Sequence, residues 1–178
     1  MNKYTFLTAG ILLLATTAFT WKASQSWTII DNYEVKFTSE DPSGVFTSLK
    51  GDVVFHPEDL SSSYFNMTID VKSINTGNGM QNQHAVSAEW MDAEKYPEIK
   101  FASRNIEATD KGYVAHGKLK MHGVEKDFDI PFKFEKNGSK GVFKGKFDVN
   151  RNDFNIGVPG KKASDVLHME VTVPVSTK

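Results

Sequence analysis

The chain has 178 residues, a formal net charge of −1 and a sequence pI near 6.5. This length suits one domain with a substantial core, and the balanced charge excludes the strongly basic surface typical of nucleic-acid-binding proteins, so no nucleic-acid partner is expected. Phenylalanine alone contributes 13 residues although the mean hydropathy is only −0.38, which indicates that apolar and polar residues alternate closely along the chain.

Residues 1–23 have the features of a secretory signal peptide. Lys3 provides a short positive region, and the apolar stretch from Phe6 to Ala18 is shorter than a typical membrane-spanning helix. Two sites, ending at Thr20 and at Ala23, half-satisfy the preference for small residues before a cleavage point, and an uncleaved anchor is the alternative. We therefore predict a mature domain over residues 24–178, periplasmic or secreted, with no integral membrane span after cleavage.

The chain contains no cysteine. Exported domains often rely on disulfides, so the core of this one must stabilise it unaided. Lipid anchoring through a cysteine at the cleavage point, as in bacterial lipoproteins, is excluded for the same reason.

From about residue 26 onward, apolar and polar residues alternate with a period of two, which is typical of half-buried β-strands. The pattern covers residues 33–37, 49–55, 65–71, 99–101, 113–121, 128–134, 143–149 and 167–175. Turn-forming residues between these segments indicate antiparallel hairpins, at Asp41-Pro42-Ser43-Gly44, Asp110-Lys111-Gly112, His122-Gly123 and Asn137-Gly138. The sequence therefore predicts an all-β protein, either an antiparallel up-and-down barrel of about eight strands or a β-sandwich.

The alternation is lost between Ile74 and Tyr96. This part of the chain predicts a loop followed by a short helix near residues 80–92, with Val86 and Trp90 on one helical face. A helix of this length, inserted into a barrel, is expected to lie across an open end.

Small residues interrupt the apolar faces of the predicted strands, at Gly51, Ala115, Gly117 and Gly145. They leave room in the interior, although glycine in a strand also marks bulges and bends. A barrel of about eight strands can hold one small ligand when side chains do not fill it. The candidate ligand-lining residues have the inward parity: Phe37, Phe55, Met67, Phe101, Leu119, Phe132 and Phe147, with Trp90 from the predicted helix.

The histidines give little indication of chemistry. His116, His122 and His168 share the polar parity of their segments, so we expect them to be solvated, and the chain has no HExxH or GxSxG motif. His84 differs because it lies in the segment without alternation, where it either pins the helix or supplies a polar contact at the barrel mouth. We predict no catalytic residue, no metal site and no cofactor, and a hydrolase or metal site around His84 is the enzymatic alternative.

Arg151 lies in the stretch NRNDFNIG, just after a predicted strand. One interpretation is an ion pair with Asp148 or Asp153 that fixes a turn. The other is a contact to a ligand head group at the barrel rim.

Taken in order, several motifs resemble the YceI-like domain family: WTIIDNYEVKF, SINTGN, QNQHAVSAEWMDAEKYPEIKFAS, GKLKMHGVEKDFDIPFKF, and RNDFNIG before VLHMEVTV. The resemblance spans about residues 27–175. It implies a secreted bacterial protein with a lipocalin-like antiparallel barrel that binds a polyisoprenoid or another long apolar lipid. It also implies that His84 is the histidine of the inserted segment and Trp90-Met91 its aromatic pair, replacing the usual Phe-Phe. Asn155 stands where glycine is common in the family.

We therefore expect an exported, non-enzymatic protein that binds a polyisoprenoid or similar apolar lipid through the lining residues given above and His84. The alternative is a ligand-free structural or protein-interaction barrel of the cell envelope, filled by its own side chains. The sequence is compatible with a monomer or a homodimer.

Overall fold

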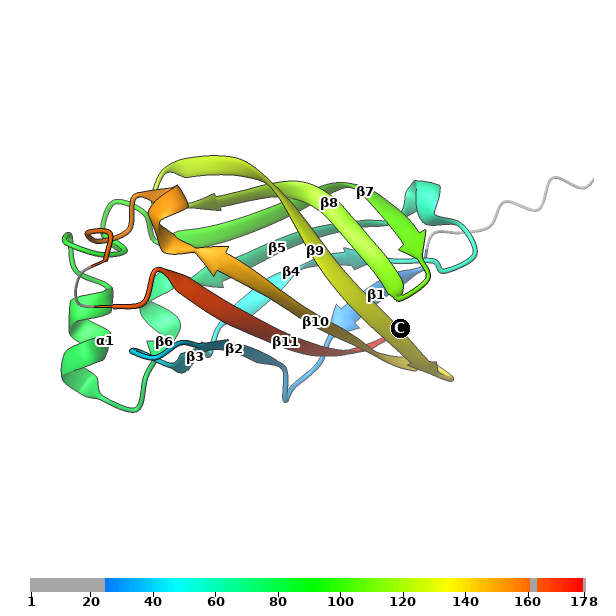
Figure 1. Ribbon diagram of the computed structural model, residues 1–178. Coiled ribbons are helices and arrows are strands. Elements are labelled where there is room, and N and C mark those ends of the chain that lie inside the picture. The colour runs from blue at the N-terminus through cyan, green and yellow to red at the C-terminus, as the bar shows by residue number, and fades with distance from the viewer. Residues whose placement is uncertain (1–24, 161–162, 178) are drawn as a thin grey trace, which may run out of the picture.

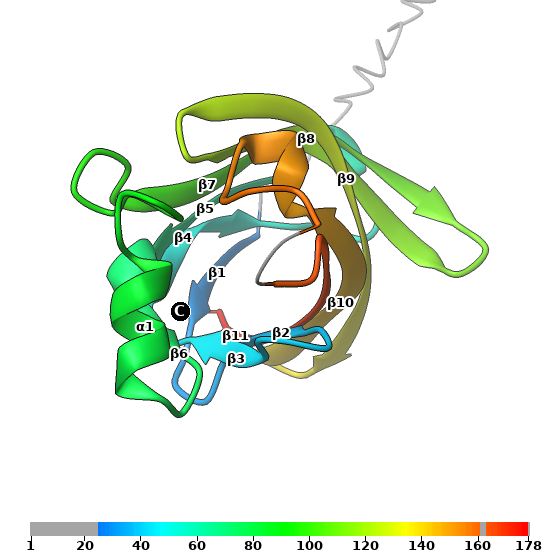
Figure 2. The same ribbon diagram turned by 60° about the vertical axis from the view of Figure 1, so that its left-hand side comes forward.

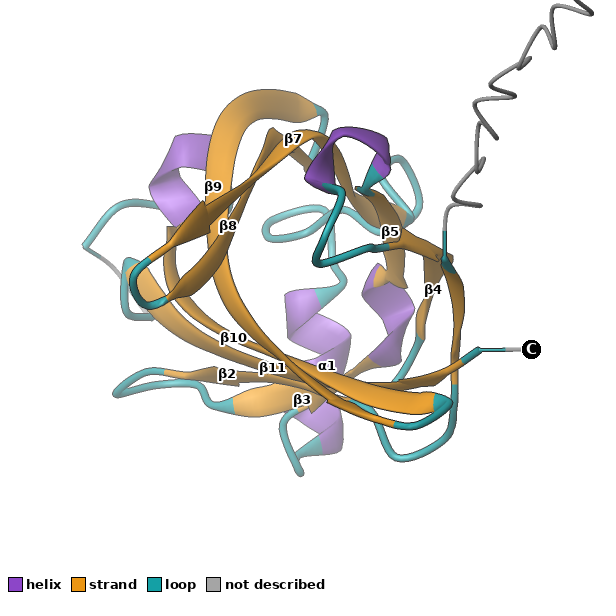
Figure 3. Cartoon of the chain, turned by 90° about the vertical axis from the view of Figure 1, so that its right-hand side faces the viewer, coloured by secondary structure: helices purple, strands orange, loops and turns teal. Residues whose placement is uncertain are grey.

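The structure is a computed structural model that describes residues 25–160 and 163–177. Its antiparallel strands form a closed barrel (Figures 1 and 3). In order around the ring, the strands are β1 (Ser26–Ile29), β4 (Leu49–Val54), β5 (Tyr64–Asp70), β7 (Glu98–Thr109), β8 (Gly112–Met121), β9 (Val124–Asn137), β10 (Lys140–Asn150) and β11 (Val166–Ser176). The ring closes where β11 pairs with β1, with Val175 opposite Ile29. The predicted eight-stranded up-and-down barrel is confirmed, and the sandwich is excluded.

Three short strands extend the barrel wall at one end: β2 (Glu34–Thr38), β3 (Gly44–Phe46) and β6 (Ile74–Asn75). β2 pairs with β11, β3 pairs with β2, and β6 pairs with β3. The segment predicted at residues 33–37 is observed as β2, while β1, which the alternation did not mark, precedes it after a break. Asn32 lies in this break with a left-handed φ of 69°, a conformation that asparagine tolerates better than most residues.

The α-helix of the described residues, α1 (Gly79–Ala85), lies at the end of the barrel where β2, β3 and β6 are found (Figure 2). The side-chain oxygen of Asn78 caps it by accepting hydrogen bonds from the backbone N–H groups of Met80 and Gln81. The prediction placed the helix near residues 80–92. The observed helix is shorter because the chain folds back after Ala85, whose carbonyl accepts a hydrogen bond from the N–H of Met91.

Three single-turn 3-10 helices complete the secondary structure of residues 25–160 and 163–177: η1 (Leu60–Ser62), η2 (Val71–Ser73) and η3 (Arg151–Phe154). Among the described residues, no helix is long and apolar enough to cross a membrane. The predicted signal peptide lies outside the described part of the chain.

The end of the barrel opposite α1 is filled by aromatic side chains, here called the floor cluster. It consists of Trp27, Phe55, Phe65, Tyr113, Phe132, Phe134 and Phe143. The ring of Phe55 is fully buried at its centre, and five other rings surround it with centroids 5.0 to 6.1 Å away, most of them edge-on. Edge-on packing of this kind stabilises aromatic cores beyond the burial of their area. The cluster therefore closes one end of the barrel.

The outer wall carries charged pairs between neighbouring strands. His116 on β8 lies between two carboxylates, with Nδ1 2.8 Å from Oδ1 of Asp129 on β9 and Nε2 3.4 Å from Oε2 of Glu107 on β7. His168 on β11 pairs with Asp148 on β10 at 2.6 Å. Both histidines lie on the solvated face. The hydrogen bond to Asp129, more than the nearby Glu107, raises the pKa of His116 above its ordinary value of 6.5.

This environment predicts a pH dependence of stability. A histidine whose pKa is raised on folding contributes its full stabilisation below the pKa of the unfolded chain, and the contribution is lost as the pH rises through the raised folded value. We expect Asp129→Asn to lower the pKa of His116 in an NMR titration, and Glu107→Gln to lower it less. The difference in denaturation midpoint between wild type and Asp129→Asn should be larger at pH 5.5 than at pH 9. Equal differences at both pH values would contradict this assignment.

Candidate functional site

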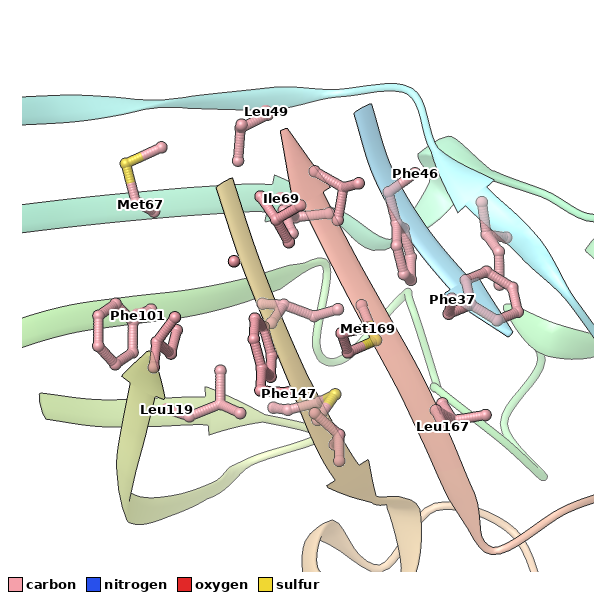
Figure 4. Close-up of a pocket in the computed structure, with 18 of the residues that line it drawn as sticks. Phe37, Phe46, Leu49, Met67, Ile69, Phe101, Leu119, Phe147, Leu167 and Met169 are labelled. Carbon is pink, nitrogen blue, oxygen red and sulfur yellow. The ribbon is translucent and has the colours of Figure 1, made fainter. Parts of the chain in front are cut away.

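Above the floor cluster, the barrel encloses a cavity of about 250 Å³ (Figure 4). The strands contribute inward side chains at a middle level of the barrel: Leu49, Met67, Ile69, Phe101, Leu119, Ile130, Phe147, Leu167, Met169 and Val171. Most of these side chains are aliphatic and thinner than the rings of the floor cluster, so they do not meet across the barrel. Phe65, Phe132 and Phe143 form its base.

Gly145 on β10 contributes to this space, because it lines the cavity without a side chain. Gly117 has a different role. It lies opposite a β-bulge between Ser103 and Asn105, and the ring of Phe101 covers the position that its Cβ would occupy. Of the four small residues singled out in the sequence, Gly145 lines the cavity and Gly51, Ala115 and Gly117 do not.

The residues predicted to bind ligand separate into two groups. Phe37, Met67, Trp90, Phe101, Leu119, Phe132 and Phe147 line the cavity. Phe55 lies beneath it in the floor cluster, and His84 lies outside it on the exposed surface of α1. The period of two identifies which side chains point inward, but not their height along the barrel axis. Ligand contact itself stays a prediction for all nine residues.

Other lining residues were missed although their signal was present. Ile69, Ile130, Met169 and Val171 have the same inward parity as the candidates, while Phe46 lies on β3, which is too short to show a pattern. Ile156 and Ala163 reach the cavity from the loop between η3 and β11. No periodicity in the sequence marks a loop position of this kind.

The mouth of the cavity lies at the α1 end, where Trp90 is held between two groups. Its indole N–H donates a hydrogen bond to Nε2 of His84 at 2.9 Å, so this imidazole nitrogen acts as the acceptor. The Arg151 guanidinium lies over the Trp90 ring, 5.3 Å from its centroid. Glu89 Oε2 is 3.5 Å from the same imidazole nitrogen. His84 therefore positions the tryptophan, in agreement with the prediction that it pins this segment.

Arg151 fixes the loop between η3 and β11. Its side chain is only 3% exposed and makes an ion pair of 2.7 Å with Asp165. Its nitrogens also donate hydrogen bonds of 2.7 to 3.1 Å to four backbone carbonyl groups, those of Ile156, Val158, Ala163 and Ser164. A hydrogen bond from the backbone N–H of Gly160, followed by smaller contributions that include the Arg151 charge, keeps the pKa of Asp165 below its usual value.

The predicted partners of Arg151 were wrong. Asp148 pairs with His168, and Asp153 binds Lys126 at 3.0 Å. The arginine side chain instead points under the following loop, where Asp165 lies just before β11. Among the described lining residues, Arg151 and Ser164 are the polar members of an otherwise apolar set, and both lie at the mouth.

The fold and the cavity define a β-barrel that is closed at one end by its own side chains and encloses an apolar space open to the other end, an architecture suited to holding one small ligand. The chain belongs to the YceI-like domain family, whose family model matches residues 21–178.

Two curated relatives, each named UPF0312 protein, match most of the chain. The relative from Pseudomonas syringae pv. tomato is 30% identical over 136 residues, which cover 72% of this chain and 70% of the relative. The relative from Serratia proteamaculans is 28% identical over 136 residues, covering 73% and 71%.

Solved structures show the same barrel. Burkholderia cenocepacia BcnA superposes with a TM-score of 0.73 and 25% identity, covering 84% of this chain and 95% of BcnA. A polyisoprenoid binding domain from Saccharophagus degradans has a TM-score of 0.63 and 11% identity, covering 88% and 97%. At that identity, the second likeness is one of fold.

Proposed function

We propose that the protein is an exported, non-enzymatic carrier that holds part of a polyisoprenoid, or of a similarly long apolar lipid, inside the barrel. The observation that carries this proposal is the cavity lining, which is apolar apart from Arg151 and Ser164 at the mouth. Protein interiors are normally packed without such voids, and concave apolar cavities are the usual sites of small-molecule binding.

The size of the cavity favours a segment of a hydrocarbon chain. Apolar cavities of roughly 150 Å³ already bind benzene, and this one measures about 250 Å³. Each buried CH₂ group contributes about 0.8 kcal/mol, so even part of a long lipid would bind firmly. Because the floor cluster blocks the far end, the remainder of the lipid would emerge at the mouth.

The absence of reactive groups in the lining supports binding without catalysis. None of the described residues that line the cavity is Asp, Glu, His or Lys, so an acid–base pair has no counterpart among them. Within residues 25–160 and 163–177, no three His, Cys, Asp or Glu side chains group in a way that could hold a metal ion. The neighbour named a polyisoprenoid binding domain supports the ligand class by analogy of fold.

The direct test is native mass spectrometry of protein purified from its exported compartment, followed by solvent extraction of whatever is bound. We expect a stoichiometric apolar adduct in the wild type and at least about a tenfold lower occupancy in Met67→Trp, because the indole would fill the space that the hydrocarbon needs. Thr68→Trp is the matched control, since the neighbouring side chain on β5 points to the outer wall. A wild-type protein that carries no lipid and refuses added polyisoprenoids would overturn the proposal and favour an interaction module.

A further inference from the structure

We propose that the mouth end of the barrel docks on a lipid bilayer, with Met80 and Val158 entering the interface between head groups and hydrocarbon. The contact surface, here called the docking rim, consists of residues 75–88, which include α1, and residues 154–160 after β10. This inference rests on the proposed function, because docking there would bring the mouth of the cavity to the source of an apolar ligand.

Exposure of large apolar side chains supports this surface. Met80 and Val158 are 79% and 57% exposed, more than any other large hydrophobic residue in the described part of the chain. They come from segments far apart in the sequence, but both segments lie at the mouth: Ala85 and Ile156, which line the cavity, belong to the same two segments. Figure 2 shows α1 and the loop after β10 facing the same end of the barrel.

Both side chains are presented by backbone that is held in place. The carbonyl of Val158 accepts a hydrogen bond of 3.0 Å from the buried Arg151 guanidinium. The backbone N–H of Met80 donates to the side chain of Asn78 at 3.0 Å, in the capped first turn of α1. The folded backbone therefore holds both side chains in their exposed positions at the mouth.

The charge distribution favours a bilayer as the partner. The docking rim itself contains no Asp, Glu, Lys or Arg, although these four residue types make up 24% of the chain. Charged residues flank it in the sequence: Glu89 follows its first segment, and Asp153 precedes and Lys161-Lys162 follow its second. Moving charged groups into the interface is costly, and the wall of the barrel is covered with them. The mouth end can therefore approach the hydrocarbon at lower cost. It is also the end from which an apolar ligand could pass into the cavity without crossing water.

Charged residues at the edge of the docking rim indicate which bilayer to use as a probe. Asp41 lies 3.5 Å from the side-chain nitrogen of Gln81, and Glu89 lies 3.5 Å from His84. Since Lys161 and Lys162 follow the rim directly in the sequence, its edge carries residues of both signs. A zwitterionic membrane is therefore the probe that tests the apolar contact alone.

The experiment is flotation of the full mature protein with phosphatidylcholine vesicles. We expect the wild type to float with the vesicles and the double variant Met80→Glu/Val158→Glu to show at least about a tenfold lower partition, because two apolar contacts are lost and two charges must approach the interface. A second double variant, Met80→Gln/Val158→Gln, should show an intermediate loss. Tyr64→Glu is the control, since this 41% exposed side chain lies at the floor end of the barrel, and its partition should equal that of the wild type.

Flotation of Met80→Glu/Val158→Glu with wild-type affinity would overturn the docking proposal, as would a wild type that stays unbound. Self-association of the wild type that the double variant abolishes would also overturn the docking proposal, because the docking rim would then be an interface between copies of the chain. Native mass spectrometry of the same samples distinguishes the two proposals. If the protein retains lipid but does not bind vesicles, only the docking proposal is contradicted. If the protein binds vesicles but holds no lipid, only the carrier proposal is contradicted.

Discussion

Replacing Arg151 with methionine is expected to lower the free energy of unfolding by about 3 kcal/mol, near the low end of what removal of one partner from a buried ion pair costs. Methionine has a similar length but no charge and no donors. The substitution would leave Asp165 and four backbone carbonyl groups without the guanidinium that binds them. Asp165 is partly exposed and can recover water, which limits the loss. Urea denaturation of wild type and variant measures it.

The other arginine of the chain provides a matched control. Arg104 is exposed and pairs with Asp127 on the outer wall of the barrel, so Arg104→Met should cost less than about 1 kcal/mol. If the two substitutions destabilised the protein equally, the buried position of Arg151 would not be decisive, and the loop after η3 would be held by other contacts.

Phe55→Ala is expected to destabilise the protein by about 3–5 kcal/mol, the usual range for a buried phenylalanine replaced by alanine. The ring is fully buried and packs against five other rings of the floor cluster, so its removal leaves a void that stiff aromatic neighbours cannot close. Denaturant unfolding measures the loss.

Phe147→Ala makes the comparison informative, because the Phe147 ring already borders the cavity on one side. Its removal enlarges an existing space instead of creating a new one, so we expect about half the cost of Phe55→Ala. Equal costs would mean that side chains fill the middle of the barrel in solution, which would also weaken the case for an internal ligand.

The barrel could be predicted from the sequence because most of its strands alternate apolar and polar residues, and a half-buried strand must alternate. The short strands β1, β3 and β6 have at most four residues each, too few to establish a period. The break between β1 and β2 falls at Asn32, whose left-handed conformation no period marks. α1 was predicted in the right place but too long, because the turn after Ala85 depends on contacts that periodicity does not encode.

The sequence predicted which side chains of the strands point into the barrel, but not how far along the barrel axis each one lies. Phe55 and Phe37 have identical signals in the sequence, yet one lies in the floor cluster and the other lines the cavity. The partner of Arg151 could not be found from spacing, since Asp165 reaches it through a loop with no regular structure. Asn155 is a departure from the family pattern that the structure explains: its φ of 55° is left-handed, and asparagine is the usual alternative to glycine in that conformation.

Because the floor cluster and the cavity occupy different levels of the barrel, the stability of the fold and the shape of the cavity depend largely on different residues. Substitutions at Met67, Leu119 or Met169 would reshape the hollow level while the rings beneath continue to hold the fold. Most proteins lose stability when substitutions change the volume of their interior, which limits the substitutions that a core tolerates. Under the proposed carrier function, selection could vary the hydrocarbon shapes that fit inside at a lower cost in stability than changes in the floor cluster would bring, so few mutations would adapt one scaffold to another ligand.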